Sequence, residues 1–128
     1  MKATLCTLFV GLLIIGCGKQ AKKETWIEDI IATGLSERND VLSQDGIVDY
    51  NVYRDGKNDG VCFEYIMTHS EKMDGDELKA LLLPLVRTIL NEDREGETAF
   101  ESGIYLRFIY KGKDGRICGD QIITSSDL

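Results

Sequence analysis

Two segments of alternating apolar and polar residues, each interrupted by a glycine-rich turn, constrain the fold of this chain more than any other feature. In the first segment two such runs flank the turn 54–60, and in the second they flank Asp114-Gly115. Alternation with a period of two is typical of strands with one buried face, and Asn, Asp and Gly tolerate the backbone angles of tight turns. The sequence therefore predicts two antiparallel hairpins. Their strands are residues 47–53, 61–68, 104–110 and 117–124.

A helical pattern precedes each hairpin. In the first pattern, apolar residues share one face between Thr25, which can act as an N-cap, and Gly34, which is a plausible stop. Asp29 belongs to the polar face of this helix. The second pattern is strongly apolar from Leu78 to residue 90, and Pro84 within it predicts a kink or a break. Each half of the chain therefore has the order α-β-β.

The two halves also match each other in sequence. Residues 56–68 align without gaps on residues 112–124, and the alignment pairs one cysteine with another at positions 62 and 118. A duplicated α-β-β unit would explain this match, although hairpins with similar turns also resemble each other by chance. Both explanations lead to the same fold class. We expect a two-layer α+β protein in which an antiparallel sheet of about four strands carries helices on one face.

The N-terminus has the pattern of an export signal. Lys2 precedes an apolar run of 11 residues, 5–15. A membrane-spanning helix needs about 20 apolar residues, so this run is too short to be one. The run does not end in the A-x-A-like site of secreted proteins but in Ile14-Ile15-Gly16-Cys17. This motif resembles the lipobox of bacterial lipoprotein precursors. The alternative is a short hydrophobic N-terminus with a chance cysteine.

The resemblance implies a processed and anchored protein. Residues 1–16 would be the signal peptide, and Cys17 would carry thioether-linked diacylglycerol and an N-acyl chain such as palmitate. We then expect residues 17–24 to form a lipidated tether and residues 25–128 a single α+β domain. The protein would belong to the bacterial cell envelope. In a Gram-negative cell, Gly18 rather than Asp after the lipidated cysteine would favour the periplasmic face of the outer membrane.

The remaining cysteines suggest a disulfide. Cys6 leaves with the signal peptide and Cys17 carries lipid, so Cys62 and Cys118 form an even pair outside the cytoplasm. A bond between them would stabilise the fold by about 4 kcal/mol in the chain-entropy model. Two separate buried thiols are the alternative. Neither cysteine lies in a C-x-x-C motif, so a metal or redox site has little support.

The charge of the chain limits its partners. The formal net charge is −7 at pH 7. An acidic domain repels nucleic acid and would attract a cationic protein, although acidity also serves solubility alone. We expect no nucleic-acid partner, and we expect contact with the membrane through the lipid on Cys17. A cationic protein is the other candidate partner, although solubility is the simpler explanation of the acidic charge.

No motif for a cofactor or a metal ion is present. The turn that begins at Asp55 resembles a calcium loop, but Lys57 and Ile66 occupy two of the positions that need oxygen ligands. His69 is the only histidine, and no zinc motif has its spacing from the cysteines. A nucleophilic pair of Cys62 and His69 is also disfavoured, because residues seven apart on a strand face opposite sides. We expect His69 on the surface at a strand end, and neither metal nor cofactor.

Two carboxylates are the remaining candidates for chemistry. Glu64 and Asp120 occupy matching positions in the two hairpins, and both share the strand face of the cysteines. Paired carboxylates can carry out acid–base catalysis. The alternative, which the sequence favours, is that they mark the solvated face of the sheet.

Three functions follow in order of preference. The first is a non-enzymatic, lipid-anchored binding or accessory domain of the envelope. The second is an inhibitor or immunity-type lipoprotein that blocks a cationic toxin or cell-wall hydrolase through an acidic region such as residues 92–101. The third is a hydrolase that uses Glu64 and Asp120, which has the least support because the chain lacks a catalytic motif.

Overall fold

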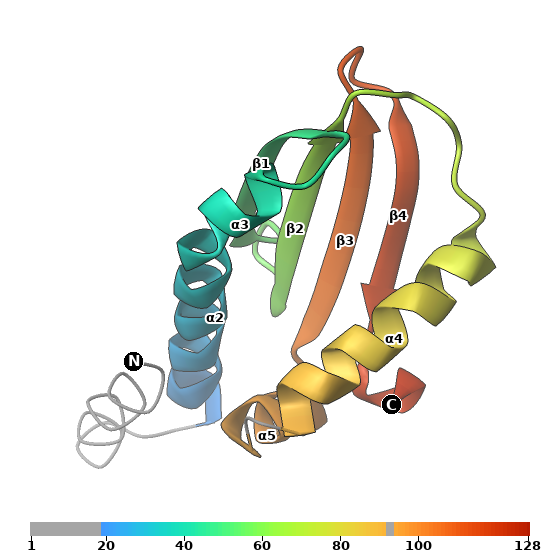
Figure 1. Cartoon of the computed structure of the whole chain (residues 1–128). Coiled ribbons are helices and arrows are strands. Elements are labelled where there is room, and N and C mark those ends of the chain that lie inside the picture. Colours follow the sequence, from blue (N-terminus) through green and yellow to red (C-terminus); the bar gives the residue numbers. More distant parts are fainter. Residues whose placement is uncertain (1–18, 92–93) are drawn as a thin grey trace.

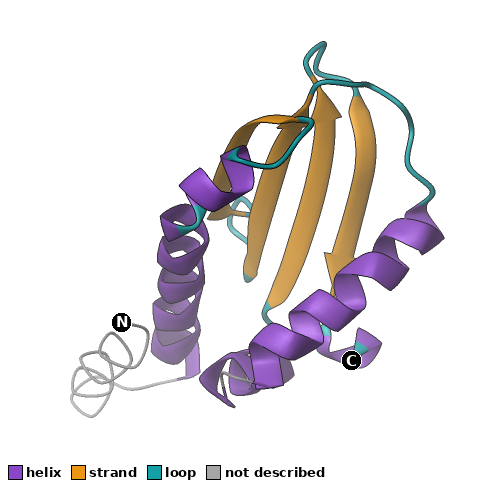
Figure 2. Cartoon of the chain, in the orientation of Figure 1, coloured by secondary structure: helices purple, strands orange, loops and turns teal. Residues whose placement is uncertain are grey.

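The computed structural model describes residues 19–91 and 94–128 (Figures 1 and 2). The first half contains α2 (Lys19–Ser36), α3 (Arg38–Leu42), β1 (Ile47–Arg54) and β2 (Gly60–Met67). The second half contains α4 (Gly75–Asn91), α5 (Arg94–Glu101), β3 (Tyr105–Gly112), β4 (Ile117–Ile123) and the 3₁₀ turn η1 (Ser125–Asp127). The expected signal peptide and the lipidation site at Cys17 lie outside the described residues. Within the described residues, no helix has the length and apolar character needed to cross a bilayer.

The four strands form one sheet in the order β1-β2-β3-β4. Both predicted hairpins are present and antiparallel, whereas the central pair β2 and β3 runs parallel. The α+β class is therefore confirmed, with a mixed sheet in place of a purely antiparallel one. The reason is the helical connection between the hairpins. The 17 residues of α4 rise by about 26 Å, the length of an eight-residue strand, so the chain returns to the end at which β2 began.

One face of the sheet carries the hydrophobic core, and α2 and α4 lie on this same face (Figure 1). Alternation places every second strand residue inward, as the sequence predicted. The strand residues buried in this core are Tyr50, Val52, Val61, Leu106, Phe108 and Ile123. The helices bury Trp26, Ile27, Leu78, Leu82, Val86, Leu90, Ala99 and Phe100 against them. Asp29, expected on the polar face of its helix, is instead buried at 5% exposure.

The first helix is longer than expected at both ends. It begins at Lys19, so residues 19–24, which the sequence assigns to the tether, are helical. Its first turns are attached to the β1–β2 turn, because Lys23 Nζ lies 3.3 Å from the Asp59 carboxylate and Glu24 forms an ion pair with Arg54. At the other end Gly34 does not stop the helix. A Cβ atom at this position would lie 3.0 Å from both Phe63 and Val52, so glycine permits close helix–sheet contact.

Helix α4, the second of the two predicted helices, continues through Pro84. Proline has no backbone N–H, so one intrahelical bond is missing there, but the Pro84 carbonyl still accepts a hydrogen bond from the Thr88 hydroxyl at 2.9 Å. The helix begins after Asp74, whose carboxylate accepts a bond from the Asp76 amide at 2.9 Å. The following helix α5 was not predicted. It buries Ala99 and Phe100 and leads the chain into β3.

Candidate functional site

The predicted carboxylates lie on the sheet face that is opposite the core. Glu64 on β2 and Asp120 on β4 both pair with Ile109 of β3, so they stand on either side of this residue. The prediction that they share a face is therefore confirmed. Their Cα atoms are two strands apart, which corresponds to about 10 Å. Each carboxylate has partners of its own.

Glu64 accepts a hydrogen bond from Tyr53 and pairs with a lysine. The Tyr53 hydroxyl lies 2.8 Å from Glu64 Oε2, and Lys111 Nζ lies 3.1 Å from the same oxygen. Burial raises the pKa of the Tyr53 phenol well above its usual value, and hydrogen bonds with Cys62 and Glu64 raise it further. The phenol therefore remains protonated and acts as a donor to the carboxylate.

Asp120 is held by an arginine through two hydrogen bonds. Arg107 Nε and Nη2 lie 2.8 and 2.5 Å from the two carboxylate oxygens of Asp120. Arg107 Nη1 also lies 3.3 Å from Asp55 Oδ1, and the Tyr105 hydroxyl donates to the second Asp55 oxygen at 2.5 Å. The arginine holds the pKa of Asp120 below its usual range. A carboxylate kept ionised in this way is a poor proton donor.

The predicted disulfide between Cys62 and Cys118 is wrong, because both thiols are free and buried. Cys62 pairs with Arg107 near the start of β3, whereas Cys118 lies at the irregularity opposite Tyr110 and Lys111, near the end of β3. The two cysteines are two strands apart across the sheet and at least three residues apart along it, so their Cα atoms are separated by about 14 Å. A disulfide requires a Cα–Cα distance below about 7 Å. Strand β3 lies between the two cysteines, and the parallel central pair adds the offset along the strands, since it brings the two hairpins together in the same direction.

Neither thiol has the surroundings of a nucleophile. Burial raises the pKa of Cys62, which disfavours the reactive thiolate. Cys118 Sγ contacts the Arg116 carbonyl at 3.7 Å. His69 is exposed beyond the end of β2, as predicted. Among the described residues, no three His, Cys, Asp or Glu side chains are grouped closely enough to hold a metal ion.

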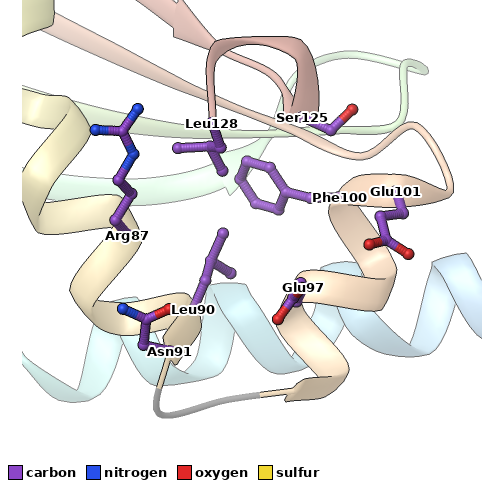
Figure 3. Close-up of a pocket in the computed structure, with 8 residues that line it drawn as sticks. All are labelled: Arg87, Leu90, Asn91, Glu97, Phe100, Glu101, Ser125 and Leu128. Atoms are coloured by element: carbon purple, nitrogen blue, oxygen red, sulfur yellow. The ribbon is translucent and has the colours of Figure 1, made fainter.

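A pocket lies at another place, between α4, α5 and the C-terminal segment (Figure 3). Its volume is about 320 Å³. Leu90, Phe100 and Leu128 provide its apolar side chains, and Figure 3 shows them directed toward one another. The remaining lining residues are polar: Arg87, Asn91, Glu97, Glu101 and Ser125. The pocket therefore suits an apolar group with polar atoms at its edge.

The C-terminal wall of this pocket is anchored to α4. Residues 125–128 are held in place, because Asp127 accepts a bond from the Thr124 amide at 2.9 Å and lies 2.7 Å from Lys79 Nζ. Sequence reasoning missed the pocket because its residues come from three separate segments and form no motif. The one available signal was Asp127 at the third position after Thr124, which is the spacing of a capping box.

No protein-family model and no curated protein matches this chain. Among solved structures, the type II secretion system pilotin AspS from Vibrio cholerae is similar at 18% sequence identity and a TM-score of 0.42. The match covers 87% of this chain and 100% of the pilotin chain. A likeness at this level carries no argument about the function of this chain.

Proposed function

We propose that this chain is a lipid-anchored protein of the bacterial cell envelope whose domain binds another protein and has no catalytic role. The lipid would be attached at Cys17, on the lipobox-like sequence Ile14-Ile15-Gly16-Cys17. Several acyl chains give nearly irreversible anchoring, since each buried CH₂ contributes about 0.8 kcal/mol. The domain would then act at the membrane surface.

The pairing of Glu64 and Asp120 with separate partners is the observation that carries the binding role. These were the best candidates for acid–base chemistry, and each is neutralised by its own cation, Lys111 or Arg107. Side chains paired in this way stabilise the sheet, and they do not share a proton. The apolar side chains that the fold leaves exposed to solvent are suited to contact with a partner protein.

Mass spectrometry of the native protein tests the anchoring. We expect a chain that begins at Cys17 and has the added mass of diacylglycerol and an acyl chain. The variant Cys17→Ala should leave the membrane fraction and keep its fold. An unprocessed terminus at Met1 without fatty acid would refute the anchor.

Cross-linking in intact envelopes tests the binding role. We expect one envelope protein to be recovered repeatedly with the wild-type protein, and the double variant Glu64→Gln/Asp120→Asn to recover it equally well. Loss of a cellular hydrolytic activity in that double variant, with the fold retained, would instead favour an enzyme.

Inhibition of a cationic toxin or cell-wall hydrolase is the second candidate. Glu97 and Glu101 favour it, because both are exposed on α5, one helical turn apart, at the edge of the apolar pocket. A deletion strain should then become more sensitive to lysozyme-like enzymes, and the variant Glu97→Lys/Glu101→Lys should fail to restore resistance. Unchanged sensitivity of the deletion strain would exclude this candidate.

A further inference from the structure

Helix α4 has two leucines that the fold leaves in solvent. Leu81 is 68% exposed and Leu85 is 62% exposed. They are four residues apart and therefore share one side of the helix. A different side packs on the sheet through Leu78, Leu82, Val86 and Leu90. Two large apolar side chains with this spacing form an apolar stripe, and nothing in the described part of the chain covers it.

The other flank of α4 is already in use, which fixes the direction of this stripe. Lys79 Nζ lies 2.7 Å from the Asp127 carboxylate, and Arg87 donates to the Asp127 carbonyl at 3.4 Å. On a helix with 100° per residue, Lys79 and Arg87 lie to one side of the buried face, and Leu81 and Leu85 lie to the other. The leucines therefore point away from η1, to the side of α4 that faces α2.

Aromatic side chains form the sheet surface in this region. The end of α2 packs on β1 and β2, where Gly34 approaches Val52 and Phe63, and the start of α4 packs on β4, where Leu78 approaches Gly119. Tyr65 on β2 and Tyr110 on β3 lie between these two contacts, in register with Gly119.

The two tyrosine rings stand side by side on the sheet and present their edges. They stack with centroids 4.7 Å apart, and both side chains are only partly buried. Figure 2 shows that α2 and α4 come together near α5 and diverge over the other end of the sheet.

Two acidic residues lie beside this surface. The Glu37 carboxylate lies close enough to the Tyr50 and Tyr65 phenols to add to the effect of burial, which raises the pKa of Tyr50 to about 12. Glu77 is exposed and precedes Leu81 by one helical turn. Neither glutamate has an ion-pair partner within residues 19–91 and 94–128. Negative charge at the border of an apolar surface favours a partner with positive charge at matching positions.

We propose that Leu81, Leu85, Tyr65 and Tyr110 form a docking surface for an amphipathic helix of another envelope protein, one that has lysine or arginine beside its apolar stripe. Such a helix would lie in the helical layer between α2 and α4, with its leucine-type side chains on the tyrosines and its cations near Glu37 and Glu77. The inference rests on the proposed binding role and names the site and the partner chemistry. A second copy of this chain fits less well, because it has the same net charge of −7. An anionic lipid surface is disfavoured for the same reason.

The test uses the processed, acylated protein in nanodiscs of zwitterionic lipid and a synthetic helical peptide of leucine and lysine, about five turns long. Empty nanodiscs give the background partitioning of the peptide. We expect saturable binding that weakens by about tenfold or more in Leu81→Glu/Leu85→Glu, as for hot-spot residues. A peptide of the same length with glutamate in place of lysine should bind the wild-type protein at least as weakly as the lysine peptide binds the double variant. Glu37→Gln/Glu77→Gln should reduce the dependence of binding on salt.

Matched controls come from the opposite sheet face. Ile117 and Ile122 are exposed by 54% and 44%, so Ile117→Glu and Ile122→Glu change similar apolar residues and should leave binding unchanged. Equal binding of the two peptides, or equal loss in the control variants, would overturn the proposal. If the protein self-associated and Leu85→Glu abolished this self-association, the occupant would be a second copy of the chain and the proposal would be wrong. If the surface bound anionic nanodiscs and not the peptide, the occupant would be a lipid surface, which would also overturn the proposal. If the purified protein has no lipid, the anchor is wrong, and peptide binding is then measured in buffer without nanodiscs.

Discussion

Arg107 binds both carboxylate oxygens of Asp120 across β3 and β4, at 2.8 and 2.5 Å. The same guanidinium reaches Asp55 in the β1–β2 turn at 3.3 Å. One side chain therefore connects β3, β4 and the β1–β2 turn. A two-point pair of this kind is stronger than an ordinary surface ion pair, because its geometry is fixed.

The first prediction concerns the pH dependence of this pair. The folded-state pKa of Asp120 is lowered from its ordinary value of about 3.9, so its contribution to stability is complete above that value and is lost as the pH falls through the folded-state pKa. Asp120→Asn should lower the free energy of unfolding by about 1 kcal/mol at pH 7 and should flatten its decline between neutral pH and pH 2. Denaturant unfolding at a series of pH values measures both effects. Asp45→Asn, at an exposed loop position, is the control, and an equally flattened profile in this control would contradict the assignment.

The second prediction concerns the thiols. Because Cys62 and Cys118 are far apart in the sheet, the folded domain should contain no disulfide, and its melting temperature should be the same with and without reductant. After denaturation without reductant, both thiols should react with a thiol reagent, whereas in the folded protein they should react slowly because they are buried. A clear fall of the melting temperature in reductant would show that the strand register is different.

The hairpins and the core face could be predicted from the sequence, because alternation with a period of two depends only on which residues avoid water. The parallel central pair could also have been derived. The segment from Leu78 to residue 90 is long enough to span the sheet, and a crossover of this length brings the chain back to run parallel. The disulfide was predicted from the even number of remaining cysteines and the expected compartment, which contain no information on strand order. The strand order places β3 between Cys62 and Cys118, and the parallel central pair adds an offset along the strands.

Other features depend on contacts that a linear pattern does not contain. Glycine at position 34 has the same appearance in a sequence whether it stops a helix or permits close packing. The helical start at Lys19 depends on the ion pairs that Lys23 and Glu24 make with residues of the β1–β2 turn. For the candidate site, the alternation of side chains along each strand was sufficient to place Glu64 and Asp120 on one face of the sheet. Their partners could not be predicted, because Arg107 and Lys111 come from a neighbouring strand.

The third prediction tests the role of Gly34. A side chain here would meet Phe63 and Val52, so Gly34→Leu should push α2 away from the sheet and cost about 1–3 kcal/mol of stability through overpacking. Ala32 lies on the exposed side of the same helix, and Ala32→Leu is the matched control, with a change of no more than about 0.5 kcal/mol. Thermal or denaturant unfolding measures the difference. Equal stability of the two variants would mean that α2 does not pack on the sheet as described.

The fourth prediction concerns the C-terminal wall of the pocket. Asp127 joins η1 to α4 through Lys79 and closes the turn through the Thr124 amide, whereas the contact from Arg87 to the Asp127 carbonyl is long, at 3.4 Å. Asp127→Asn should therefore raise the hydrogen-exchange rates of the amides of residues 127 and 128, which donate to carbonyls within the turn. Arg87→Gln should leave these rates almost unchanged, because a weak hydrogen bond contributes little to holding the turn. If neither variant accelerated exchange, the turn would be held by apolar packing of Leu128 against Leu90 and Phe100, and the ion pair with Lys79 would contribute nothing. Equal acceleration in both variants would contradict the minor role given to Arg87.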